Sequence, residues 1–144
     1  MKKVSDILKR KGNSVTSVTP GTTVIDALKI MADQNIGSVI VVADNRFLGI
    51  VTERDYSRKV VLKGRSSTET KVEEIMSTDF PKINSQDTIE QCMQLLSQNN
   101  IRYLPVFEGS EVSGIISIND VVKETILSQE ETINSLKDYL HTNM

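Results

Sequence analysis

The 144-residue chain contains an internal repeat, and this feature constrains its fold more than any other. The segment Gly49–Asp55 recurs as Gly114–Asp120, an offset of 65 residues, and the same offset carries Asn35–Ile36 onto Asn100–Ile101. Self-similarity at a fixed spacing is the signature of a repeated structural unit. The sequence therefore predicts two copies of one unit in a single chain.

Both halves show the same succession of secondary-structure signals. Val4–Leu8 matches Val72–Met76 at an offset of 68, and an insertion or deletion in a following loop explains the changed offset. In the first half we predict a leading helix (4–11), a short strand (15–18), a helix from residue 24, two strands (38–43 and 47–51) and a closing helix after residue 52. In the second half the corresponding elements are a helix (72–76), a strand (80–83), a helix from residue 89, two strands (103–107 and 112–116) and a closing helix after residue 117. This order defines a β-α-β-β-α unit of the α/β (α+β) class.

The repeats also set the predicted domain boundaries. We assign residues 1–62 to the first repeat, 63–71 to a polar linker, 72–127 to the second repeat and 128–144 to a C-terminal amphipathic helix. A half of about 60 residues is marginal as an independent fold, because it buries only about 60% of the surface of its unfolded chain. The two repeats are therefore expected to pack together with pseudo-two-fold symmetry.

The C-terminal helix has its own predicted start. Ser128–Glu131 forms a capping-box pattern ahead of an apolar stripe at Ile133, Leu136 and Leu140. Two placements remain open for this helix: it folds back on its own module, or it packs on another subunit.

Charge and composition exclude several classes of function. The net charge is -2, so no field of one sign draws nucleic acid or an acidic membrane to the chain. One cysteine, Cys92, and one histidine, His141, leave too few side chains for a Cys/His metal site or a His-dependent nucleophile. Cys92 falls on an apolar helical stripe, where a small core residue is expected. No export signal or membrane span is visible, and a single reduced thiol suits the cytosol, so a soluble, cytoplasmic protein is expected.

A motif at the last strand-to-helix junction of each half carries a family resemblance. The pattern Gly-x-x-[Ser/Thr]-x-x-Asp occurs at Gly49–Asp55 and at Gly114–Asp120, and Ile101–Val106 is similar to a second-repeat strand of the same family. The chain resembles the CBS-domain pair, also called a Bateman module, from Val4 to about Leu127, and it looks like the small standalone members.

The resemblance implies a ligand and a place for it. CBS pairs take adenosine-containing ligands in clefts between the two repeats, so AMP, ADP or ATP is expected, with NAD or S-adenosylmethionine as further options. The family's ribose-binding Asp carries over to Asp55 and Asp120, and its hydroxyl position to Thr52 and Ser117. No cofactor is required, because the nucleotide acts as a regulatory ligand.

The junction residues have two physical interpretations. An ionised Asp accepts hydrogen bonds from both hydroxyls of a ribose, and a helix start favours a phosphate. Yet Thr52 with Asp55, and Ser117 with Asp120, also match the capping box that begins many helices. A residue can serve both roles, so neither interpretation excludes the other.

Basic side chains near the first junction suggest a phosphate contact. Arg54 and Arg58 lie one helical turn apart and share a face, whereas their repeat counterparts are Asn119 and Lys123. This difference predicts two sites of unequal strength. The alternative is a solvated helix face, on which Arg54, Arg58, Lys59 and Lys63 lie with Glu53 and Asp55.

Weaker candidates complete the predicted binding set. Arg102 stands at the start of a strand and could reach the ligand, although an arginine there is usually on the surface. Thr16 and Lys82 are the polar candidates on the short strands that correspond to the family's adenine pocket. Hydroxyls of the linker, Ser66 to Thr68, could add a phosphate contact or serve only as loop residues.

The sequence thus favours a regulatory sensor module rather than an enzyme. A homodimer and an unknown effector protein are the expected partners, and no nucleic acid or membrane is expected. Two alternatives remain: a structural dimerisation module with vestigial sites, and an enzyme acting on the bound nucleotide. The second is disfavoured because the chain has no Walker-type loop and its two aspartates belong to different repeats.

Overall fold

The computed structural model describes residues 2–12 and 14–142. These residues form two compact units. The first-repeat unit contains residues 14–80 and 108–113, and the second-repeat unit contains residues 2–12, 81–107 and 114–142. Residues 1, 13, 143 and 144, which the predicted domain ranges include, lie outside the described residues.

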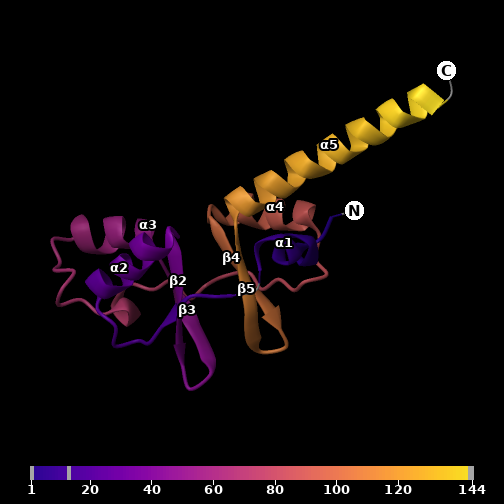
Figure 1. Ribbon diagram of the computed structural model, residues 1–144. Helices are drawn as coiled ribbons and strands as arrows, with labels where there is room; N and C mark the ends of the chain where they lie inside the picture. The colour runs from indigo at the N-terminus through magenta and orange to yellow at the C-terminus, as the bar shows by residue number, and fades with distance from the viewer. Residues whose placement is uncertain (1, 13, 143–144) are drawn as a thin grey trace. The chain divides into compact units, whose positions relative to one another are not determined.

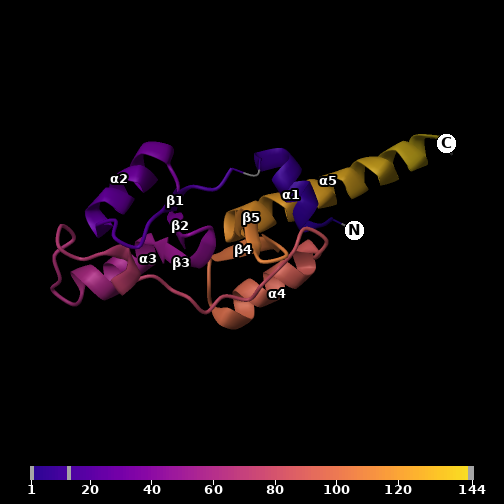
Figure 2. The same ribbon diagram turned by 90° about the horizontal axis from the view of Figure 1, so that it is seen from below.

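The first-repeat unit is built on a three-stranded mixed sheet, whose strands are labelled in Figure 2. Its strands are β1 (Ser17–Val18), β2 (Ser38–Ala43) and β3 (Arg46–Thr52), with β1 parallel and β3 antiparallel to the central β2. The crossover between β1 and β2 is helix α2 (Val24–Gln34), which buries Val24, Ala27 and Met31 as its apolar stripe predicts. Helix α3 (Glu53–Tyr56) follows β3 and continues as a π-helical turn, Ser57–Val61.

The second-repeat unit repeats this order, except that none of its described residues form a strand equivalent to β1. It contains the helices α1 (Val4–Lys11), α4 (Ile89–Asn99) and α5 (Ile118–Thr142) and most of the strands β4 (Tyr103–Glu108) and β5 (Glu111–Ser117). Residue 108 of β4 and residues 111–113 of β5 belong to the first-repeat unit. The strand predicted at 80–83 is wrong: only Ile83 pairs there, through an isolated parallel bridge to Val106. Pro81 has no N–H to give to a ladder, which limits pairing at this point.

The leading segment of each repeat packs in the unit of the other repeat. Helix α1 lies in the second-repeat unit, and the 3-10 helix Val72–Glu74 lies in the first-repeat unit. The two attachments are equivalent, because an antiparallel bridge joins Lys3 to Thr88 in one unit and Lys71 to Thr23 in the other. The spatial units therefore cross the boundaries assigned from the sequence, which remain predictions.

The linker 63–71 is packed rather than loose. The backbone N–H groups of Val24 and Ile25 donate to the carbonyls of Thr70 and Ser67, at 2.9 and 3.0 Å. Thr70 is 3% exposed. The linker thus satisfies N–H groups at the start of α2 that have no partner inside the helix.

The helix start predicted at Ser128 is also wrong. Helix α5 runs without a break from Ile118 to Thr142, so the closing helix of the second repeat and the C-terminal helix are one element. No Gly or Pro interrupts these 25 residues, and the Thr132 hydroxyl donates to the Ser128 carbonyl inside the helix. Figures 1 and 2 show α1 and α4 beside the first turns of α5. Among the described residues, no helix combines the length and apolar character that a membrane span requires.

Candidate functional site

Both strand-to-helix junctions are capped as their sequence pattern predicts. The Asp55 N–H donates to the Thr52 hydroxyl at 3.1 Å, and the Thr52 N–H donates to the Asp55 carboxylate at 2.9 Å. The second junction repeats this, with 3.2 Å from the Asp120 N–H to the Ser117 hydroxyl and 2.8 Å in return. The capping interpretation is confirmed, and ligand contact at the same residues stays a prediction.

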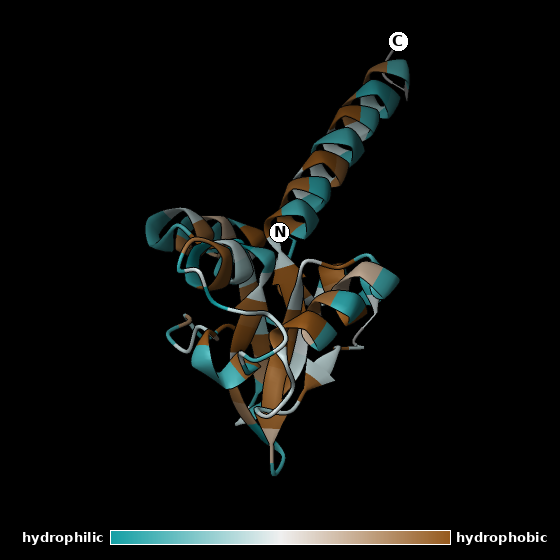
Figure 3. Cartoon of the chain, turned by 90° about the vertical axis from the view of Figure 1, so that its left-hand side faces the viewer, coloured by the Kyte–Doolittle hydropathy of each residue, from teal (hydrophilic) through white to brown (hydrophobic). Residues whose placement is uncertain are grey.

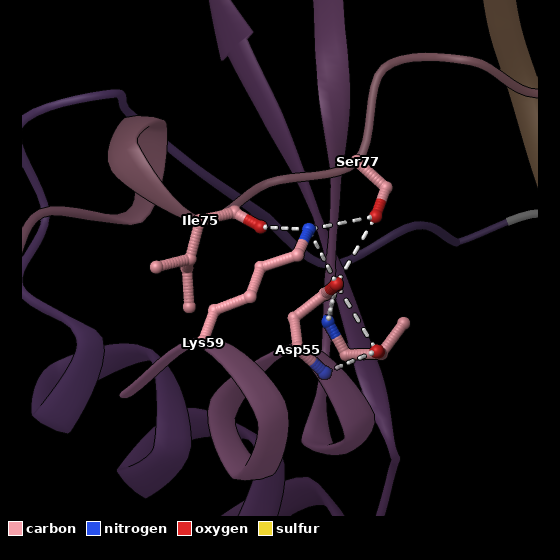
Figure 4. A network of polar contacts seen from close by, with 5 residues as sticks. Asp55, Lys59, Ile75 and Ser77 are labelled. Atoms are coloured by element: carbon pink, nitrogen blue, oxygen red, sulfur yellow. Dashed lines mark hydrogen bonds and ion pairs between the residues drawn. The ribbon is translucent and has the colours of Figure 1, made fainter. Parts of the chain in front are cut away.

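Asp55 is held by protein groups on both of its oxygens (Figure 4). Oδ2 accepts from the Thr52 N–H and hydroxyl, while Oδ1 accepts from the Ser77 hydroxyl and lies 3.0 Å from the Lys59 ammonium. A carboxylate offers about four acceptor positions. Asp55 is 7% exposed, so a ligand can contact its carboxylate only by displacing one of these partners.

Asp120 is less fully engaged. Its Oδ2 accepts from the Ser117 N–H and from the Lys11 ammonium, which is 2.7 Å away. Its Oδ1 accepts no hydrogen bond from any residue that the structure describes. The second junction therefore differs from the first in having one carboxylate oxygen that accepts no hydrogen bond from the described residues.

The two junctions differ by a charge reversal one turn into the helix. Lys59 corresponds to Glu124 at the repeat offset of 65. Glu124 is 2% exposed and pairs with Arg10 of α1 at 3.1 Å. The first unit thus supplies the cation for Asp55 from the π-helical turn after α3. The second unit supplies Lys11 to Asp120 and Arg10 to Glu124, both from the exchanged helix α1.

The motif glycines serve close packing. A Cβ added to Gly49 would lie 2.7 Å from the Ser77 carbonyl oxygen, and one added to Gly114 would lie 2.9 Å from a methyl group of Leu8. Ser77 and Leu8 belong to the segments that are exchanged between repeats. Of the two uses that a glycine permits here, close approach of a ligand or of the chain itself, the structure shows the second.

The remaining predicted residues are spread over both units. Arg54 is half-buried and Arg58 exposed at the first junction, and Arg102 is exposed just before β4. Thr16 donates to the Gln34 side chain, and the Lys82 ammonium lies 5.5 Å from the centre of the Phe107 ring. These last two contacts involve no junction residue, and the binding role of all five stays a prediction.

Sequence reasoning missed the side chains that hold the two aspartates. Lys59 was placed on one helix face with Asp55 but was not predicted to pair with it, although a spacing of four residues favours an ion pair. Ser77 and Lys11 were not detectable, because they are distant in sequence and reach the aspartates only through tertiary packing.

The fold and the two junctions define a class: a duplicated α+β module whose copies share element order, capped junctions and exchanged leading segments. The family model described as CBS domain matches residues 4–61 and again 72–126. The chain therefore belongs to the CBS-domain family and is a CBS-domain pair protein.

Known relatives agree with this assignment. The chain is 36% identical to the mitochondrial CBS domain-containing protein CBSX3 of Arabidopsis thaliana, over 95% of this chain and 71% of the relative. It is similar to the structure of a Burkholderia ambifaria protein with CBS domains that is proposed to act in signal transduction, at 43% identity and a TM-score of 0.84, over 89% of this chain and 96% of that one. It also resembles the hexameric CBS-CP12 protein from bloom-forming cyanobacteria, at 26% identity and a TM-score of 0.77, over 96% and 83% of the two chains. None of these three names describes an enzyme.

Proposed function

We propose that this CBS-domain pair is a cytoplasmic regulatory module that binds an adenine nucleotide, AMP, ADP or ATP, at its strand-to-helix junctions. The observation that carries the proposal is the duplicated pair of a hydroxyl and an aspartate at the start of a helix, with one oxygen of Asp120 left for a ligand. A ribose presents two adjacent hydroxyl donors, and a carboxylate is an acceptor for both.

The two sites are expected to differ in strength. At the second junction a ribose meets the unused oxygen of Asp120, while the N-terminus of α5 favours a phosphate. At the first junction a ligand must displace Lys59 or Ser77 from Asp55, although Arg54 and Arg58 offer more positive charge to a phosphate. At the first site the ribose is therefore bound more weakly and the phosphates more strongly than at the second. We expect the affinity of the first site to rise more steeply from AMP to ADP to ATP.

A second candidate function is a structural module with vestigial sites. The saturated carboxylate of Asp55 favours it, because that side chain already has a structural role in the absence of ligand. Nucleotide binding to either junction separates the two candidates.

Isothermal calorimetry on the full chain tests the proposal. We expect heat on titration with AMP or ATP, a loss of the tighter site in Asp120→Asn, and little change in Asp33→Asn, which alters an exposed aspartate on α2. An absence of binding by every adenine nucleotide, or equal binding by all three proteins, would refute the proposal. The effector protein that responds to the ligand, and a homodimer as the assembled form, belong to the same proposal.

A further inference from the structure

Helix α5 carries an apolar stripe on its C-terminal segment, which projects from the rest of the second-repeat unit. Every side chain from Gln129 to His141 is exposed, and Figures 1 and 3 show this segment projecting beyond α1 and α4. Ile133, Leu136 and Leu140 are 50%, 59% and 60% exposed. Burying such side chains against a partner is favourable, because it removes apolar surface from water.

The spacing of the stripe is that of a coiled-coil seam. Ile126, Ile133 and Leu140 lie seven residues apart, and Gln129 and Leu136 hold the second seam position of the same heptads. The side chains that α5 buries in its own unit, those of Val121 and Glu124, stand outside this seam. The seam therefore remains available while α5 stays packed on its unit.

We propose that the projecting segment of α5 pairs in antiparallel orientation with the same segment of a second copy of this chain. In a pair centred between Ile133 and Leu136, each Ile133 packs against Leu136 of the second copy. Leu140 then faces Gln129 of the second copy. The overlap thus covers residues 129–140, which lie within the exposed segment Gln129–His141. It ends next to Ser128, which is half-buried in its own unit.

Charges beside the seam select the orientation. Glu130 and Lys137 occupy the same heptad position, seven residues apart. In the antiparallel pair Glu130 of one copy lies beside Lys137 of the other, and symmetry makes this contact twice. In a parallel pair the flanking contacts join Thr132 to Lys137 and Thr125 to Glu130, so no opposite charges meet. The antiparallel pair is therefore the better match.

This pairing names the contact surface of the homodimer proposed above, and it is independent of nucleotide binding. Analytical ultracentrifugation of the full chain at micromolar concentrations tests it. We expect a dimer that Leu136→Asp abolishes and that the matched control Ser135→Asp, an exposed neighbour outside the seam, leaves intact. Thermal unfolding followed by circular dichroism shows whether each variant keeps its fold.

A charge exchange tests the orientation. Glu130→Lys and Lys137→Glu each set like charges against one another at both contacts, so each should weaken the dimer roughly tenfold. The double variant should recover the original affinity, and an equimolar mixture of the two single variants should form heterodimers.

Three results would overturn the inference. These are a monomeric chain, a dimer that survives Leu136→Asp, and a double variant as weak as the single variants. A dimer that survives Leu136→Asp would leave the proposed homodimer standing and refute only its attachment through α5.

Discussion

At the scale of single residues, the aspartates of the two junctions are equivalent in sequence and unequal in surroundings. Both close a capping box, but Asp55 also contacts Ser77 and Lys59, whereas among the described residues Asp120 has Lys11 as its one further partner. The two aspartates are therefore expected to contribute different amounts to the free energy of unfolding.

Substituting each aspartate by alanine should show the difference between their contributions to stability. Asp55→Ala removes the carboxylate half of the capping box and leaves Ser77 and Lys59 without this acceptor, which we expect to lower the free energy of unfolding by about 2–3 kcal/mol. Asp120→Ala removes the same half of its capping box and the ion pair with Lys11, in which the carboxylate is more exposed, with an expected loss of about 1 kcal/mol. Urea unfolding measures both values, and equal losses would contradict the assigned environments.

The motif glycines offer a second matched pair. Gly49→Ala sets a methyl group against the Ser77 backbone carbonyl, which cannot move without shifting the chain, so a loss of about 1–3 kcal/mol is expected. Gly114→Ala meets only the end of the Leu8 side chain, which can change rotamer, and should lose less than about 1 kcal/mol. A larger loss of stability in Gly114→Ala than in Gly49→Ala would contradict the closer packing of Gly49 against the Ser77 backbone.

Cys92 links stability to pH. Burial raises the pKa of its thiol from the ordinary 9.0 to about 11, because a buried thiolate is poorly solvated. The unfolded chain therefore releases the thiol proton at a lower pH than the folded chain. The resulting stabilisation is complete below pH 9 and is lost as the pH rises from about 9 to about 11.

The Cys92→Ala variant isolates this contribution from the titration of other groups. The difference in unfolding free energy between the original chain and the variant should shrink by on the order of 1 kcal/mol between pH 8 and pH 10.5. A difference that stays constant over this range would contradict the buried position of the thiol.

At the scale of elements, the predicted helix starts at residues 24 and 89 are confirmed, whereas the start predicted at Ser128 is wrong. Thr23 and Thr88 cap α2 and α4, and both helices end at an asparagine in the left-handed region, Asn35 at φ 53° and Asn100 at φ 51°. These positions depend on local chemistry that the sequence shows directly. The length of α5 was not predictable from Ser128, because a capping pattern inside a helix looks the same as one at its start.

The left-handed helix ends give an element-scale prediction. Asn35→Gly keeps access to positive φ and should change the melting temperature little, whereas Asn35→Val forces a β-branched residue into that region. We expect Asn35→Val to lose about 1–2 kcal/mol, or roughly 3–8 °C in melting temperature. Equal melting temperatures for the two variants would contradict the left-handed conformation.

At the scale of the whole molecule, the repeat led correctly to the family and, apart from the strand expected at 80–83, to the order of elements. The exchange of the leading segments was not predictable, because the apolar face of Val4–Lys11 shows that the helix is buried but not which repeat buries it. That exchange brings Lys11 to Asp120 and Ser77 to Asp55, so the environment of both candidate sites depends on it.

The central claim is that an adenine nucleotide binds at the duplicated junctions. An NMR titration of the isotope-labelled full chain with AMP tests it residue by residue. We predict that the amide signals of Thr52 to Asp55 and of Ser117 to Asp120 shift on binding, those of the second junction at lower concentration. Unchanged junction signals at saturating AMP, or shifts confined to the groove between α4 and α5 lined by Met93, Ser97 and Thr125, would contradict the account.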